Sequence, residues 1–175
     1  MGFFNDPAHP ELSRVHKIDW MAEHTKKLHL EVDMVVLHNG RAINPDPVSG
    51  ALWDIRGWLK QYRNRIFSWH IKDGRRNSPT PTINTPYVQT IQRTPTFLDA
   101  LYAGEGQIGK GYPFDPDPAV VGYRDIWLEW DTGGQNFYEI ESNSSVGPAT
   151  GPTADPGRSL RHAKISARNL LALNR

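Results

Sequence analysis

Ionisable residues gather at the ends of three apolar segments of this chain. Glu31 and Asp33 lie in the first segment, His70 and Lys72 end the second, and Glu129 lies near the end of the third. A charged side chain in a strand buried on both faces is costly unless it is paired or bound to a metal. Carboxylate and imidazole ligands suit divalent ions such as Mn²⁺, Mg²⁺, Co²⁺ or Zn²⁺. The residue types therefore point to the chemistry of a divalent metal ion.

The intervals between these residues fit ligands carried by successive strands. Asp33 and His70 are 37 residues apart, and His70 and Glu129 are 59 residues apart. A strand–helix–strand unit takes roughly 30 residues or more, so the second interval corresponds to one unit with a long insertion. Ligands of α/β proteins bind at the carboxyl ends of parallel strands, where these side chains would meet.

Hydrophobic periodicity predicts the elements that would position these residues. Residues at helical spacing predict four helices, the third of them short, over residues 12–27, 50–63, 95–103 and 158–174. Runs of β-branched, aromatic and Leu residues predict three strands, over residues 27–38, 65–72 and 124–131. Alternating helices and strands predict an α/β fold with a parallel sheet. We expect one domain over residues 1–175, with a long irregular insertion at about 74–118.

The composition excludes several classes of function. Twenty Lys and Arg against nineteen Asp and Glu leave a net charge of +1, too little to hold a phosphate backbone, so no nucleic-acid partner is expected. There is no Cys, which excludes disulfides, thiolate metal sites and Cys nucleophiles. No apolar run approaches the ~18 residues of a membrane span, and the first residues lack the pattern of a signal peptide. We therefore expect a cytoplasmic protein with no membrane partner.

Five motifs follow one another along the chain: LEVDMVV, FSWHIKD, AGEGQI, IWLEWD and SLRHAKISARNLLAL. In this order they resemble the C-terminal half of the sugar phosphate isomerase/epimerase family, in the xylose isomerase-like TIM-barrel superfamily. Members carry an E-x-D strand, an H-x-K-D strand, a G-E-G turn, a strand ending in V-E-Q-D or similar, and a closing S-x-x-x-L helix. The resemblance runs from about Ile18 to Leu173.

The resemblance implies a divalent-metal site at the mouth of a barrel. Asp33, His70 and Glu129 match the metal-ligand positions, and Glu129 would also be the acid or base closest to the metal. The metal would polarise the carbonyl of a sugar substrate while a carboxylate moves a proton on the neighbouring carbon. Lys72 would contact the substrate or hold the strand end.

Other residues near the strand ends are expected to support the metal ligands or to contact the substrate: Glu31, His38, Asp73, Trp130 and Asp131. Simpler roles stay open for three of the site residues. Asp33 could cap a helix or form an ion pair, Glu31 could form an outward salt bridge, and Lys72 could form a structural ion pair.

The number of strands bears on whether the chain acts alone. A complete barrel needs eight βα units and about 200–250 residues, whereas only about three units are visible here. Exposed strand edges favour pairing with another chain, so we expect a second copy or a different partner to complete the barrel, unless the chain is a truncated product. The alternative to a sugar enzyme is a non-catalytic half barrel that completes or regulates a partner. A metal-cluster nuclease would need more His ligands and a basic groove.

Overall fold

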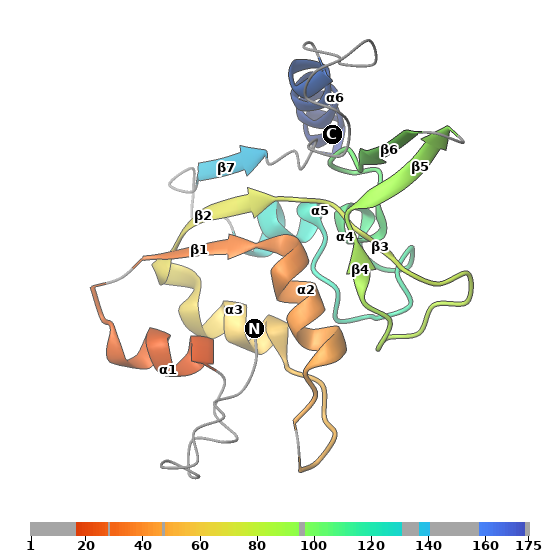
Figure 1. Ribbon diagram of the computed structural model, residues 1–175. Helices are drawn as coiled ribbons and strands as arrows, with labels where there is room; N and C mark the ends of the chain where they lie inside the picture. The colour runs from red at the N-terminus through yellow and green to blue at the C-terminus, as the bar shows by residue number, and fades with distance from the viewer. Residues whose placement is uncertain are drawn as a thin grey trace.

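The computed structural model has a mixed α/β architecture built around a small parallel sheet (Figure 1). It describes residues 17–27, 29–46, 48–94, 97–130, 137–140 and 158–173. No closed barrel is present among these residues. None of the helices in the described part of the chain has the length and apolar character needed to cross a bilayer.

The sheet has three strands in the order β1 (Leu30–Asp33), β2 (Ile66–Ile71) and β7 (Phe137–Ile140). All neighbours are parallel, as the alternation of helices and strands predicted. The register places Asp33 beside His70 and His70 beside Glu139, so these three residues form one row across the sheet. Because side chains alternate between the faces of a strand, a whole row lies on one face.

The predicted first strand, residues 27–38, is wrong over its second half. The strand ends at Asp33, and α2 (Met34–Ile43) begins at the next residue. Asp33 caps this helix, since its Oδ1 accepts a hydrogen bond from the backbone N–H of Val36 at 2.9 Å. Met34, Val35 and Leu37 of the apolar run are buried, but in a helix that leaves Val36 exposed. Periodicity alone does not separate a short apolar run in a helix from one in a strand.

Two further helices near the N-terminus follow the predicted order, with shorter bounds. α1 (Lys17–His24) lies within the helix expected at 12–27, of which residues 12–16 are outside the described part. α3 (Ile55–Tyr62) starts where the Asp54 carboxylate accepts the N–H of Gly57 at 3.0 Å. A single 3₁₀ turn, η2 (Arg63–Arg65), then leads into β2.

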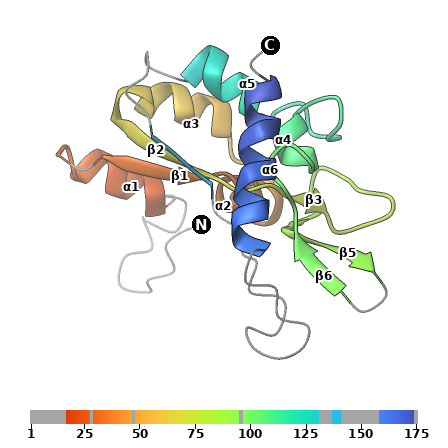
Figure 2. The ribbon, with the colours of Figure 1, turned by 90° about the horizontal axis from the view of Figure 1, so that it is seen from above.

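The long connection after β2 contains regular structure, and the short helix predicted over residues 95–103 is wrong. β3 (Arg75–Arg76) pairs with β4 (Tyr87–Val88), and β5 (Thr90–Thr94) pairs with β6 (Phe97–Ala100), both antiparallel. Pairing with β5 places Phe97 and Leu98 in a strand although their spacing also fits a helix. The β5–β6 hairpin lies at the opposite side of the molecule from α1 (Figure 2).

The Asp73 carboxylate holds the Gly-Glu-Gly turn against the end of β2. Oδ1 accepts the N–H groups of Gly74 and Gly109 at 2.7 and 2.9 Å, and Oδ2 accepts that of Gly106 at 2.8 Å. A Cβ at Gly106 or Gly109 would lie 2.4 or 2.3 Å from an Asp73 oxygen. This turn therefore binds an anion of its own chain and leads directly into α4 (Gln107–Lys110).

The strand predicted over residues 124–131 is also wrong. α5 (Tyr123–Asp125) and the π-helical turn η3 (Ile126–Trp130) occupy this segment. The Asp125 carboxylate accepts the N–H of Gly122 at 3.0 Å, which stabilises the helical start that Ile-Trp-Leu-Glu-Trp continues. The third strand of the sheet is β7, later in the chain.

The C-terminal helix α6 (Arg158–Leu173) was predicted correctly and is fixed by polar contacts. Its Ser166 Oγ accepts the N–H of Ala103 at 3.0 Å, and its Asn169 side chain donates to the Ala103 carbonyl at 2.9 Å. His162 lies 3.0 Å from the Leu101 carbonyl through Nε2. α6 is thus tied to the segment that leads from β6 into the Gly-Glu-Gly turn.

Candidate metal centre

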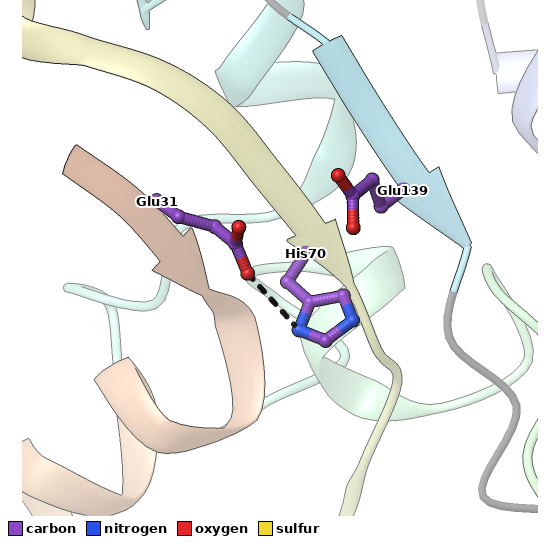
Figure 3. Close-up of side chains that lie close together, drawn as sticks. All are labelled: Glu31, His70 and Glu139. Atoms are coloured by element: carbon purple, nitrogen blue, oxygen red, sulfur yellow. Dashed lines mark ion pairs between the residues drawn. The ribbon is translucent and has the colours of Figure 1, made fainter. Parts of the chain in front are cut away.

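One polar side chain from each strand of the sheet meets near the middle strand. Glu31 of β1, His70 of β2 and Glu139 of β7 each offer a ligand atom, and these atoms all lie within 4.8 Å of one another. Figure 3 shows the two carboxylates on either side of the imidazole, with His70 Nδ1 3.6 Å from Glu31 Oε1. The three residues are brought together from segments that are 39 and 69 residues apart in the sequence.

Asp33 and Lys72 form an ion pair beside this cluster. Asp33 Oδ2 lies 2.9 Å from Lys72 Nζ and 3.6 Å from His70 Nδ1. The other oxygen of Asp33 caps α2. Asp33 therefore has both of the simpler roles that the sequence left open, a helix cap and an ion pair. The Lys72 side chain, which is 14% exposed, and the His70 imidazole therefore share the same Asp33 oxygen.

The two faces of the sheet differ in burial. Val32, Trp69 and Ile71 project from one face into the hydrophobic core and are at most 3% exposed. On the polar face Glu31 is 53% exposed, while the His70 side chain is 21% exposed. Carboxylates at this exposure stay solvated, so a cation is not required to make the fold tolerate them.

The donor set nevertheless fits a divalent ion. Two carboxylates and one imidazole are ligands shared by Zn²⁺, Mn²⁺ and Co²⁺. Ligand atoms bonded at about 2.0–2.2 Å lie no more than about 4.4 Å apart, so small side-chain adjustments would bring these three onto one ion. The open face leaves the remaining coordination positions to water or substrate.

Glu129 does not join the other expected ligands. It lies on η3 and forms an ion pair with Arg56, whose Nη1 is 3.3 Å from Glu129 Oε2. Arg56 also contacts Asp125 at 2.9 Å, so this pair links α3 to α5 on the surface. Trp130 ends the same helical turn, and Asp131 lies outside the described residues.

Two residues expected to support the site are buried elsewhere. His38 lies in α2, 2% exposed, with Nε2 3.1 Å from the Val121 carbonyl, and burial lowers its pKa to about 4. Asp73 follows β2 but faces the Gly-Glu-Gly turn, and burial raises the pKa of its carboxyl to about 6 against the effect of its backbone hydrogen bonds. Neither side chain belongs to the Glu31–His70–Glu139 cluster.

The sequence reasoning missed Glu139. It lies between the strand predicted over residues 124–131 and the C-terminal helix, where no strand is predicted, although Phe137, Tyr138 and Ile140 are residues that favour strands. Strand-forming residues around one acidic residue, after a Gly-Gly pair, were the available signal. Glu139 takes the position in the row that Glu129 was expected to fill.

Comparison of the chain with family models, curated proteins and solved structures finds no match. The resemblance in the motifs therefore stands as an expectation from the sequence.

Proposed function

We propose that the protein is a divalent-metal-dependent isomerase or epimerase that acts on a sugar or sugar derivative. The observation that carries this proposal is the meeting of Glu31, His70 and Glu139, one from each strand of a parallel sheet, with ligand atoms within 4.8 Å of one another. The motif order around Asp33, His70 and Lys72 supplies the reaction class. Glu31 and Glu139 replace Asp33 and Glu129 in the ligand set expected from the sequence.

The surrounding residues suit proton transfer at a carbon next to a carbonyl. A bound divalent ion would polarise the carbonyl and an adjacent hydroxyl of the sugar. Glu139, with two carboxylate oxygens, can offer one as a ligand and use the other to take the proton from the neighbouring carbon. Lys72, oriented by its 2.9 Å ion pair with Asp33, is placed to donate a hydrogen bond to a substrate oxygen.

The experiment pairs two substitutions of the same type, Glu139→Gln and Glu129→Gln. Titration calorimetry with Mn²⁺ measures metal affinity, and NMR in deuterated water measures exchange at the carbon next to the carbonyl in a panel of ketoses. We expect Glu139→Gln to weaken metal binding at least tenfold and to abolish exchange, because it removes a charged ligand. Glu129→Gln is the matched control, and it should retain both. Wild-type metal affinity in Glu139→Gln would contradict the proposed ligand set.

The openness of the polar face favours a second candidate, a non-catalytic half barrel. Glu31 is about half exposed, and the described residues form a three-stranded sheet rather than a closed barrel. A complete barrel would cover this face with further strands. Roughly one tightly held divalent ion per chain, together with solvent exchange in a sugar, supports the enzyme. A metal-free chain that binds a barrel-forming partner supports the subunit.

A further inference from the structure

A cavity lies between β3 and α4, away from the metal centre. Its volume is about 780 Å³, which is within the range of pockets for small molecules. Residues from β3, from the loop after it, and from the Gly-Glu-Gly turn through α4 line the cavity. None of the Glu31, His70 and Glu139 side chains takes part in its wall.

Two cationic side chains at this cavity have no anionic partner among the residues that the structure describes. Arg75 and Lys110 are both exposed, and neither forms an ion pair or a side-chain hydrogen bond with another described residue. Lys110 Nζ lies over the ring of Phe114, 5.7 Å from its centroid, which holds the ammonium close to the cavity wall. Both charges are therefore accessible to a molecule that enters the cavity.

Arg76, the next residue along β3, differs from Arg75 because its guanidinium is buried and paired. Its guanidinium is 1% exposed and forms a salt bridge with Asp115 at 2.8 Å. Its Nη1 donates to three backbone carbonyls, those of Thr82, Ile83 and Thr85. Arg76 also lines the cavity, but its guanidinium is bonded to Asp115 and to the loop carbonyls, so the accessible charge of β3 is that of Arg75.

The rest of the wall suits a small organic molecule that carries a negative charge. Asn77 and Ser78 add polar groups, and Pro79, Pro81 and Leu101 add apolar surface. Glu105 is the acidic residue among the lining residues, and its Oε2 accepts the N–H of Tyr102 at 2.9 Å. Arg75 and Lys110 bring two positive charges and Glu105 one negative, so the accessible wall carries one net positive charge.

We propose that this cavity binds the oxyanion group, phosphate or carboxylate, of a small organic molecule. Arg75 and Lys110 would contact the oxyanion, since charge-assisted hydrogen bonds from these side chains to phosphate and carboxylate are among the strongest in proteins. The apolar wall would contact the carbon skeleton. The proposal rests on this cavity alone and does not depend on the metal centre.

Binding of four probes to the full chain tests the proposal. Glucose 6-phosphate, gluconate and uncharged glucose share a carbon skeleton and differ in the oxyanion, and inorganic phosphate is the group alone. Calorimetry at low ionic strength should show binding of glucose 6-phosphate or gluconate at least tenfold tighter than that of glucose. Tighter binding of the first or of the second identifies the oxyanion as phosphate or carboxylate.

Charge-neutralising variants assign the binding to this cavity. Arg75→Gln and Lys110→Gln should each weaken binding of the charged probe about tenfold or more, because each removes one charge-assisted contact. Lys60→Gln, which removes an exposed positive charge on α3, is the matched control and should bind like the wild type. The titrations are run with a chelator and without divalent metal, so binding through an ion at the Glu31–His70–Glu139 centre does not contribute and failure of the metal proposal leaves this result unaffected.

Three outcomes would overturn the proposal. These are equal affinity for the charged probes and glucose, wild-type binding by both Arg75→Gln and Lys110→Gln, or equal weakening by Lys60→Gln. Circular dichroism and thermal unfolding confirm that each variant is folded. Both substituted side chains are exposed, and neither belongs to the buried Arg76–Asp115 pair.

Discussion

The Asp33 carboxylate contacts both the first turn of α2 and the polar side chains at the end of β2. One oxygen begins α2, and the other holds Lys72 at 2.9 Å beside His70. The strand ends where this cap begins, so the same residue sets the length of β1 and the position of the ammonium group.

Asp33→Asn and Asp33→Ala separate the two roles of this residue. Asn caps a helix about as well as Asp, so Asp33→Asn should change stability little while it removes the counter-charge of Lys72. Asp33→Ala loses the cap as well and should cost about 1 kcal/mol more in the free energy of unfolding. Urea unfolding of both variants measures the difference. Equal stability of the two variants would show that the cap contributes nothing.

Two buried titratable residues should give opposite pH dependences of stability. His38 stays neutral in the folded chain down to a pKa of about 4, whereas the unfolded chain takes up its proton near pH 6.5. His38 therefore contributes about 3 kcal/mol to the free energy of unfolding above pH 6.5, and this contribution is lost as the pH falls from 6.5 to 4. The pKa of Asp73 is raised from 3.8 to about 6, so its contribution is present below pH 3.8 and is lost as the pH rises through 6. The contribution of Asp73 to the free energy of unfolding is also about 3 kcal/mol.

The wild-type chain should accordingly show little net effect of these two groups between pH 4 and 6.5. His38→Gln should become more stable on acidification, and Asp73→Asn should become less stable. Urea unfolding at pH 4, 5, 6 and 7 gives the slopes. Parallel curves for the wild type and both variants would contradict the two pKa shifts.

At the scale of elements, α6 depends on a few buried polar contacts as well as on its apolar side. Ser166 is fully buried, and its hydroxyl is the acceptor for the N–H of Ala103. Ser166→Ala should lower the free energy of unfolding by about 1–3 kcal/mol, because the buried N–H loses its acceptor. Lys164→Ala, on the exposed side of the same helix, should stay within about 0.5 kcal/mol of the wild type. Equal effects of the two substitutions would show that the Ser166 contact does not fix the helix.

The elements that the sequence predicted well are those with an unambiguous period or composition. α3 and α6 carry apolar residues at helical spacing, and β2 is short, aromatic and β-branched. The failures are apolar runs whose state depends on a cap or a pairing partner rather than on their own periodicity. Residues 34–38 become a helix once Asp33 caps it, and Phe97–Ala100 become a strand once β5 pairs with them.

The candidate site was predictable in part for the same reason. His70 and Glu31 lie on strands that the sequence located, so their meeting followed from a parallel sheet. The sequence predicted Glu129 where the structure has Glu139, because the third strand was predicted over residues 124–131, where the local apolar run is stronger. Local sequence does not encode which of two segments pairs with β2.

At the scale of the whole molecule, the open polar face and the two outer strands bear on the assembly. β1 and β7 are the outer strands of the described sheet, and each pairs with β2 on one side. The single partial barrel over residues 1–175 stays a prediction, and with it the pairing with a second copy or another chain.

Light scattering coupled to size-exclusion chromatography tests that expectation. If a second copy completes the sheet, the mass should be a multiple of 19.8 kDa and should fall toward one chain on dilution. A stable species of about 20 kDa at all concentrations, with a cooperative unfolding transition, would contradict self-assembly.

The cradle around the Asp73 carboxylate has a consequence for how this chain can vary. The space that a methyl group would need at position 106 or 109 is already taken by Asp73 oxygens. In a library randomised at positions 73, 106 and 109, functional clones should therefore keep both glycines whenever they keep the aspartate. A shorter side chain at 73 should not release either glycine, because a Cβ at 106 would also lie 2.5 Å from the Gly74 carbonyl oxygen and a Cβ at 109 would lie 2.8 Å from the backbone of Gly104. Both glycines should therefore persist whatever residue replaces the aspartate.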